Sequence, residues 1–74
     1  MEIQEIHDKK VVTIENIYIE FGFVLANKLI NSLVINCENF VVEYSDLDVF
    51  VDYEKLCDMY YELTGNKLGD YNEH

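Results

Sequence analysis

The side chains best suited to nucleophilic or metal chemistry are two cysteines and two histidines, Cys37, Cys57, His7 and His74. A catalytic thiolate needs a base held within hydrogen-bonding reach. His74 is the last residue of the sequence and His7 lies in a weakly patterned segment, so neither is expected to sit beside a thiol. Zinc motifs place two ligands close together in the sequence, and no two of these residues are. We expect free thiols in a reducing compartment and no metal or other cofactor.

The carboxylates do not predict calcium binding or acid–base catalysis. Asp46-Leu47-Asp48 begins like a calcium loop, but Val51 stands where such a loop needs glycine. Acid–base catalysis requires one carboxyl group desolvated in a pocket, whereas the acids here fall on sides that are predicted to face water. The three glycines are isolated, so the sequence has no glycine-rich phosphate loop. We therefore do not expect the protein to be an enzyme.

The overall charge is the strongest indication of function. Fifteen Asp and Glu residues face five lysines, which gives a net charge of −10 over 74 residues. Such a field opposes direct binding to nucleic acid or to an anionic membrane and favours a basic protein partner. The alternative is that the acids serve only solubility. We expect no membrane-spanning segment and no signal peptide, and hence a cytoplasmic protein.

Residues 39–65 are predicted to form a β-hairpin followed by an amphipathic helix. A turn at Ser45-Asp46 would place two sets of cross-strand pairs on opposite faces. The apolar face pairs Tyr44 with Leu47, Val42 with Val49 and Phe40 with Val51. The other face pairs Glu43 with Asp48, Val41 with Phe50 and Asn39 with Asp52.

The helix that follows should begin after Asp52 as N-cap and end at Gly65. Its buried stripe is predicted to be Tyr53, Leu56, Cys57, Tyr60 and Leu63. Its exposed side is predicted to carry Glu54, Asp58 and Glu62, which recur every four residues and so rise about 6 Å per step along one face.

Residues 11–35 are predicted to repeat this plan. If Glu15-Asn16 forms a turn, Ile14 opposes Ile17 and Val12 opposes Ile19; a single bent strand is the alternative. After Gly22 the period changes to that of a helix. The predicted apolar face of this helix is Leu25, Ala26, Leu29, Ile30 and Leu33. Residues 1–8 fit either a helical turn or a short edge strand.

These elements predict one α+β domain over residues 1–74. Its architecture is a small two-layer fold, in which a four-stranded, mainly antiparallel sheet carries two helices on one face. The order is a ββα-ββα pseudo-repeat, with units at 11–35 and 39–65 and a loose tail at 66–74.

Two surfaces are candidates for binding. The first is acidic and spans the second hairpin and its helix, with two aromatic side chains as contact anchors. Its predicted partner-binding residues are Glu43, Asp48, Phe50, Asp52, Glu54, Asp58, Tyr61 and Glu62. The second is an apolar patch on the sheet face away from the helices, made of Val11, Tyr18, Val41 and Phe50, which could join two copies into a structural or regulatory homodimer.

In size, charge, composition and α+β pattern the chain resembles the small acidic inhibitors that phages and mobile elements use against host defence, including anti-CRISPR proteins. Those proteins share no motif, so the resemblance assigns no residue. It implies an inhibitor that mimics nucleic acid and occupies the basic nucleic-acid-binding surface of a target such as a defence nuclease. A phage-encoded protein of this kind would act in the host cytoplasm.

Overall fold

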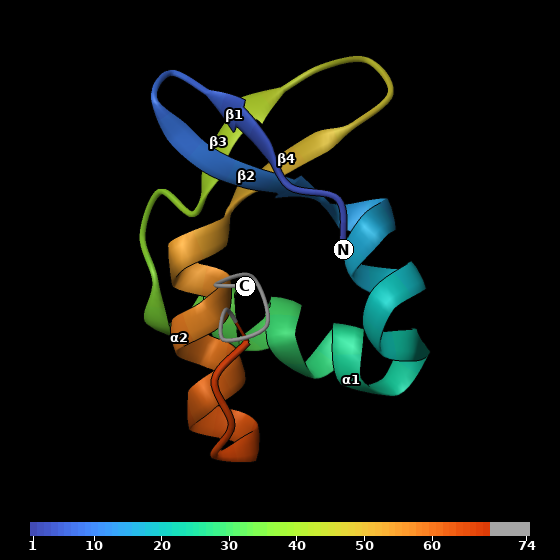
Figure 1. Cartoon of the computed structure of the whole chain (residues 1–74), viewed down its shortest axis with the longest axis vertical. Coiled ribbons are helices and arrows are strands. Elements are labelled where there is room, and N and C mark those ends of the chain that lie inside the picture. Colours follow the sequence, from blue (N-terminus) through green and yellow to red (C-terminus); the bar gives the residue numbers. More distant parts are fainter. Residues whose placement is uncertain (69–74) are drawn as a thin grey trace, which may run out of the picture.

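Two β-hairpins and two helices alternate along the chain in the computed structural model, which describes residues 1–68. Within that range the four strands form one antiparallel sheet, and both helices lie on the same side of it (Figure 1). This confirms the predicted α+β class and the two-layer arrangement. The elements are β1 (Gln4–Ile6), β2 (Lys9–Thr13), α1 (Ile14–Asn36), β3 (Val41–Tyr44), β4 (Val49–Asp52) and α2 (Tyr53–Thr64).

The sheet joins the two hairpins through its central strands. The strand order is β1-β2-β4-β3, so β2 and β4 pair with each other as well as with their own hairpin partners. Val12 stands opposite Val51 in this central ladder. Both valines are completely buried. Because cross-strand partners point to the same side of a sheet, this pair forms the floor on which the helices pack.

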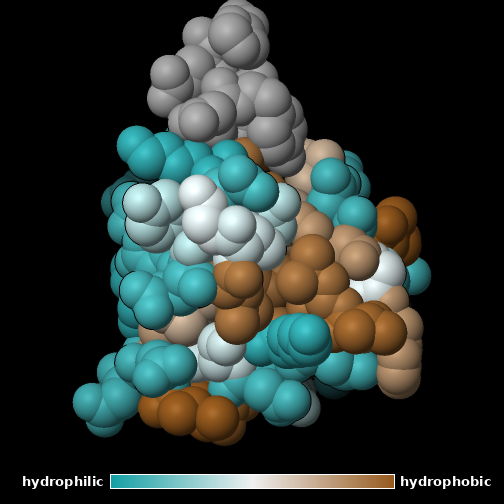
Figure 2. Space-filling model, turned by 90° about the horizontal axis from the view of Figure 1, so that it is seen from below, coloured by the Kyte–Doolittle hydropathy of each residue, from teal (hydrophilic) through white to brown (hydrophobic). Residues whose placement is uncertain are grey.

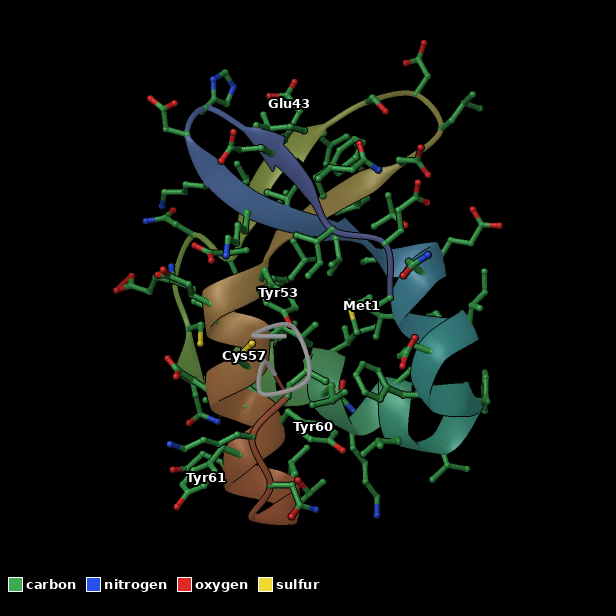
Figure 3. The ribbon with its side chains drawn as sticks, viewed as in Figure 1. Met1, Glu43, Tyr53, Cys57, Tyr60 and Tyr61 are labelled. Carbon is green, nitrogen blue, oxygen red and sulfur yellow. The ribbon has the colours of Figure 1, made fainter. Side chains whose placement is uncertain are left out.

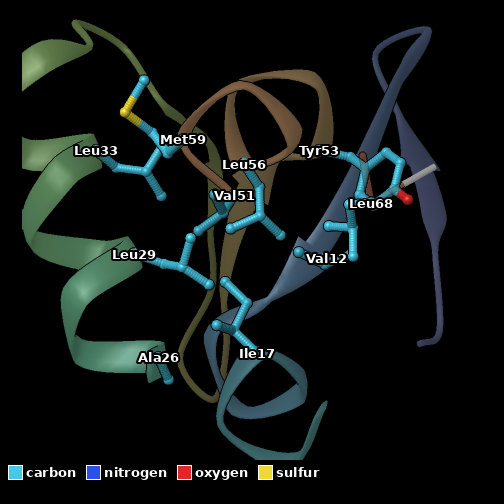
Figure 4. Close-up of a cluster of buried hydrophobic side chains, with 10 residues drawn as sticks. All are labelled: Val12, Ile17, Ala26, Leu29, Leu33, Val51, Tyr53, Leu56, Met59 and Leu68. Atoms are coloured by element: carbon cyan, nitrogen blue, oxygen red, sulfur yellow. The ribbon is translucent and has the colours of Figure 1, made fainter. Parts of the chain in front are cut away.

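The core lies between that floor and the helices. Figure 4 shows Leu29 of α1 directed toward Val51 of β4, and Leu33 of α1 beside Met59 of α2. Burying side chains of this size contributes roughly 1.5–3 kcal/mol each, so a core of this kind is the main stabilising term in a chain this short. The buried cluster comprises Val12, Ile17, Ala26, Leu29, Leu33, Val51, Tyr53, Leu56, Met59 and Leu68.

The predicted first hairpin across Glu15-Asn16 is wrong, as is the bent-strand alternative, because α1 begins at Ile14. Thr13 caps the helix, and its hydroxyl oxygen accepts a hydrogen bond from the backbone N–H of Asn16 at 3.0 Å. Val12 and Ile17 flank this cap, and both are completely buried. That arrangement is a hydrophobic staple, which fixes the direction in which the chain enters the helix.

The first hairpin lies earlier in the chain and uses the segment for which the sequence left two alternatives. Residues 1–8 include an edge strand, β1, in which Gln4 pairs with Val11 and Ile6 with Lys9. His7 and Asp8 form the turn, and both have positive φ angles of 53° and 64°. Tight hairpin turns of this kind require positive φ at both central residues, and His and Asp tolerate it better than most side chains.

A bend at Gly22 divides α1 into two helical segments, residues 14–21 and residues 23–36. Gly22 has φ 81° and ψ 169°, a backbone conformation that glycine adopts almost alone. Two contacts span the bend: the Tyr18 hydroxyl donates to Asn27 Oδ1 at 2.6 Å, and the Tyr18 and Phe23 rings lie 6.0 Å apart. The bend lets Ile17 and Leu29, from different segments, reach the same core.

The second hairpin forms, but its predicted register is wrong. Tyr44 pairs with Val49 and Glu43 with Phe50, so the connection runs from Ser45 to Asp48 and closes two residues later than predicted. The backbone N–H of Ser45 donates to the Asp48 carbonyl at 2.9 Å, which closes the longer turn. A β-bulge between Val41 and Glu43 then brings Val41 opposite Val51.

Helix α2 has the predicted ends and a buried stripe that differs in part. Its N-cap is Asp52 and its C-cap is Gly65, which has φ 77°. Tyr53 and Leu56 are buried as predicted, but Met59 takes the next inward position while Leu63 is 43% exposed. The predicted loose tail is also wrong at Leu68, which is buried against the core; the rest of that tail, 69–74, lies outside the described residues.

Among the described residues, α1 taken as a whole is long and apolar enough to cross a membrane by length and composition. The bend at Gly22, however, divides it into segments that are each shorter than the roughly 20 residues a span needs. The sequence pattern predicts a change from strand to helix at Gly22, not one continuous helix. Length and composition are weak evidence for a membrane span, because core helices meet the same criteria. Here α1 contributes Ile17, Ala26, Leu29 and Leu33 to the core.

Replacing Gly22 by alanine should destabilise the fold by about 1–3 kcal/mol, since the backbone conformation at this position is strained for any residue with a Cβ. A steric clash is not the cause, because nothing lies within 4 Å of the added Cβ. Gly65→Asn is the matched control, since its left-handed conformation is one that asparagine tolerates. Urea unfolding of the two variants tests this, and equal losses of stability would contradict it.

Candidate functional site

An open hollow of about 650 Å³ lies between the β1–β2 hairpin and α2. Tyr53 and Cys57 come from the half of α2 nearest the sheet, as Figure 3 shows. Carboxylates reach the hollow from both elements. We call this site the acidic hollow; its lining residues are Glu5, Asp8, Lys9, Lys10, Asp52, Tyr53, Glu54, Cys57 and Asp58.

The charge of the acidic hollow is strongly negative. Its lining holds five carboxylates and two lysines. One of the lysines is engaged, since Lys9 Nζ lies 3.6 Å from Asp52 Oδ2. A concave surface lined by charge of one sign focuses the field and attracts groups of the opposite sign. The hollow is therefore suited to a cationic group rather than to an anion.

The predicted acidic row of α2 is exposed as expected. Glu54, Asp58 and Glu62 all face solvent, and the first two also line the acidic hollow. Lys55, the lysine nearest to this row in the sequence, is directed elsewhere. Its Nζ donates to the backbone carbonyls of Glu38 at 2.6 Å and Asn39 at 3.4 Å. The carboxylate row therefore gains no counter-charge from Lys55.

The predicted grouping of Glu43, Asp48 and Asp52 on one face of the second hairpin does not form. Glu43 pairs with Phe50 across the ladder and its Oε1 lies 3.1 Å from His7 Nε2, an ion pair whenever the imidazole is protonated. Asp48 lies in the turn, where its backbone N–H donates to the Ser45 hydroxyl. The two-residue change of register explains why Glu43 and Asp48 are not cross-strand neighbours.

Asp52 is a structural residue rather than a water-facing charge. Its side chain is only 8% exposed. The Oδ1 atom accepts a hydrogen bond from the backbone N–H of Glu54 at 3.0 Å, and Oδ2 pairs with Lys9. The sequence correctly predicted the N-cap. Because this carboxylate is buried and engaged through both oxygens, it presents less charge to a partner than the exposed acids of α2 do.

The predicted apolar patch on the outer sheet face is not assembled. Tyr18 belongs to α1 and Val11 is completely buried. Val41 is 36% exposed and Phe50 is half-buried beside Glu43. Val11 and Tyr18 were placed in the patch by a hairpin across Glu15-Asn16 that does not form, and Tyr18 lies on α1 instead of on the sheet.

Some exposed side chains, in the acidic hollow and elsewhere, could not be identified from the sequence pattern. Glu5 and Asp8 were overlooked because residues 1–8 had no assigned structure. Leu47 is 92% exposed and Tyr44 is 75% exposed at the tip of the second hairpin. The signal for that tip was present, since Ser45-Asp-Leu-Asp48 is rich in turn-forming residues. Tyr61, a predicted anchor, is 52% exposed on α2.

The cysteines are free thiols in the described part of the chain, and both are partly buried. Burial raises the pKa of the Cys57 thiol above its usual range, and the carboxylates of Asp58 and Glu54 raise it further. Tyr53 and Lys10 act in the opposite direction. A raised pKa keeps the thiol protonated and unreactive, the opposite of what a nucleophile needs. Within residues 1–68 no cluster of three or more His, Cys, Asp or Glu side chains could hold a metal ion.

Comparison with known proteins gives no relative: no protein-family model, curated protein or solved structure matches the chain. Function is therefore inferred from the geometry and charge of the described surface.

Asp52→Ala should lower the free energy of unfolding by about 0.5–2 kcal/mol, because the cap of α2 is lost and Lys9 loses its partner. Asp52→Asn should lose much less, since an amide oxygen can still accept from the Glu54 N–H. Asp46→Ala, at an exposed turn position, is the control. Urea unfolding of the three variants checks this. A large loss of stability in Asp52→Asn would mean that the fold depends on the charge of Asp52 and its ion pair with Lys9 rather than on the capping hydrogen bond.

The Cys57 thiol should react with iodoacetamide at higher pH in the folded chain than in urea. In a Cys37→Ser background, the midpoint of the rate–pH profile should lie above that of the unfolded chain. The pKa of Cys57 is higher in the folded chain than in the unfolded chain. The folded state therefore keeps its full stability at pH values below the unfolded pKa, and it loses stability as the pH rises from the unfolded pKa to the folded pKa. Asp58→Asn should lower the folded midpoint. Coincident folded and unfolded midpoints would contradict the assigned burial.

Proposed function

We propose that the protein is an acidic binding protein that occupies a basic, nucleic-acid-binding surface on a protein target. The observation that carries this proposal is the acidic hollow together with the carboxylate row that continues from it. Carboxylates from the β1–β2 hairpin and from α2 border one concave surface. Glu62 extends this surface by one further helical turn. The phosphates of a nucleic-acid strand also form a regular row of negative charge, so a target that binds phosphates could accept the carboxylate row of α2 in their place.

The cost of the row supports a binding role over solubility alone. Glu54, Asp58 and Glu62 are like charges four residues apart, an arrangement that destabilises a helix. Glu62 also lies in the last turn of α2, where the helix dipole is negative and no basic residue compensates. Acids that served only solubility could stand at positions without this cost.

A contact anchor lies next to the row. Tyr61 precedes Glu62 on α2, and about half of its side chain is exposed. Tyrosine offers a large, rigid contact surface at a low cost in side-chain entropy, which is why it is enriched at interfaces. Charge would bring a basic target to this side of the molecule, and Tyr61 would add apolar contact once it is bound.

The narrower proposal is that the target is a nuclease of host defence and that binding inhibits it, as in anti-CRISPR proteins. It rests on the resemblance in size, charge and fold class. Both the general and the narrower proposal require the same feature of the target, a basic groove that normally holds a phosphate backbone.

Neutralising the row should abolish target binding while leaving the fold intact. In the triple variant Glu54→Gln, Asp58→Asn and Glu62→Gln, stability should change by less than about 1 kcal/mol, because relief of the repulsion along α2 is offset by the loss of Glu54 at the positive end of the helix dipole. The control triple Glu2→Gln, Glu15→Gln and Glu38→Gln removes the same net charge from exposed positions outside the hollow. Binding should survive in the control.

The measurement is affinity capture from host lysate at low and high salt, with added duplex DNA as competitor and mass spectrometry as readout. We expect a basic nucleic-acid-binding protein that is retained at low salt and released by either salt or DNA. If both triple variants lost target binding equally, binding would depend on the net charge of the protein and not on the carboxylate row of α2. Retention that both salt and DNA leave unchanged would contradict the proposal.

A further inference from the structure

The second segment of α1, residues 23–36, presents an exposed stripe that the proposed function does not use. Four side chains, all exposed, recur along it at spacings of four, three and four residues. The two end residues are apolar, with Val24 68% exposed and Ile35 78% exposed. Figure 2 views the molecule from the helix side and shows separate apolar areas with hydrophilic side chains between them. We call this set the α1 stripe; it consists of Val24, Lys28, Asn31 and Ile35.

The spacing of the α1 stripe is that of a coiled-coil seam. Alternating steps of three and four residues keep one face of a helix against a partner helix. The order four, three, four is also the same when read in reverse. An antiparallel copy of the segment would therefore place Val24 opposite Ile35 at both ends, with Lys28 opposite Asn31 in the middle. The stripe is complementary to itself about a two-fold axis.

The charge distribution favours a second copy over other occupants. Residues 23–36 contain a single charged side chain, Lys28, in a chain with a net charge of −10. A basic partner would find no carboxylate there, and an anionic lipid surface would repel the rest of the molecule. Two copies can meet at this face without bringing carboxylates together. Lys28 of one copy can donate to the side-chain oxygen of Asn31 of the other.

The size of the face agrees with a modest dimer. A helical segment of this length extends about 21 Å. Val34, which flanks the stripe, is 61% exposed and widens it beside Ile35; Phe23 is 73% exposed but lies further round the helix. Stable interfaces bury about 800 Å² per partner, and a single helix pair lies near or below that value. A symmetric interface uses the same patch on both subunits, as this one would.

We propose that the protein forms a two-fold dimer through antiparallel pairing of the α1 stripe. The acidic hollow is lined by the β1–β2 hairpin and α2 and by no residue of α1, so the dimer keeps two hollows available. The interface differs from the outer sheet face considered in the sequence analysis; it is apolar at both ends and contains no carboxylate. Its stability should therefore change little with salt, whereas target binding should weaken.

A complementary pair of variants tests both the dimer and its orientation by sedimentation equilibrium. Val24→Glu and Ile35→Lys should each weaken self-association at least tenfold, because each homodimer contains the charged residue opposite an apolar one at both ends. An equimolar mixture should associate again as a heterodimer, since Glu at 24 then faces Lys at 35 while the other end remains apolar. Circular dichroism confirms that each variant is folded.

Leu47→Glu and Tyr44→Lys are the matched controls. Both side chains are highly exposed on the β3–β4 hairpin, and neither lies in the α1 stripe. The control variants should associate like the wild type. A wild-type chain that stays monomeric up to about millimolar concentration would overturn the proposal. So would a mixture that does not associate, which would exclude antiparallel pairing. A monomer whose binding to phosphatidylcholine vesicles depends on Val24 and Ile35 would assign the stripe to lipid instead.

Discussion

The pairing of β2 with β4 is the interaction on which the remaining structure depends. Each hairpin is local in sequence, but the contact of Val12 with Val51 joins residues that lie on either side of α1. Without it, α1 and α2 would share no floor and the acidic hollow would lose one of its walls. Non-local pairing of this kind requires the entropy of loop closure to be lost before the new contacts stabilise the fold. The apolar helices repay that cost only after the two hairpins have joined.

The fold class followed from the sequence, whereas the first hairpin did not, and the apolar pattern explains why. Ile17, Ile19, Phe21 and Phe23 alternate with other residues as in a strand. In the helix, Ile17 is buried and Phe21 half-buried while Ile19 and Phe23 are exposed, so the alternation came from two apolar faces. The local capping signal at Thr13, with buried Val12 and Ile17 around it, outweighed the period of two.

The acidic row of α2 was predictable, while its surroundings were not. Helical periodicity and a strong N-cap determine which side of α2 faces water, so Glu54, Asp58 and Glu62 could be placed from the sequence. The opposite wall needed the location of Glu5 and Asp8, which depends on a turn of two non-glycine residues with positive φ. Asp52 shows a further limit of pattern reading, because a capping carboxylate can also be buried when a lysine reaches it.

The bulge between Val41 and Glu43 has a consequence for how the chain behaves at high concentration. β3 is an edge strand, and a regular edge exposes unpaired N–H and C=O groups that can template a further strand from another molecule. The bulge interrupts that row, and β1, the opposite edge, has only three residues. The sequence contains no proline that could block an edge strand. The bulge in β3 and the short length of β1 limit edge pairing instead. Sheet-to-sheet aggregation is thereby disfavoured, which leaves association to the helical side of the molecule.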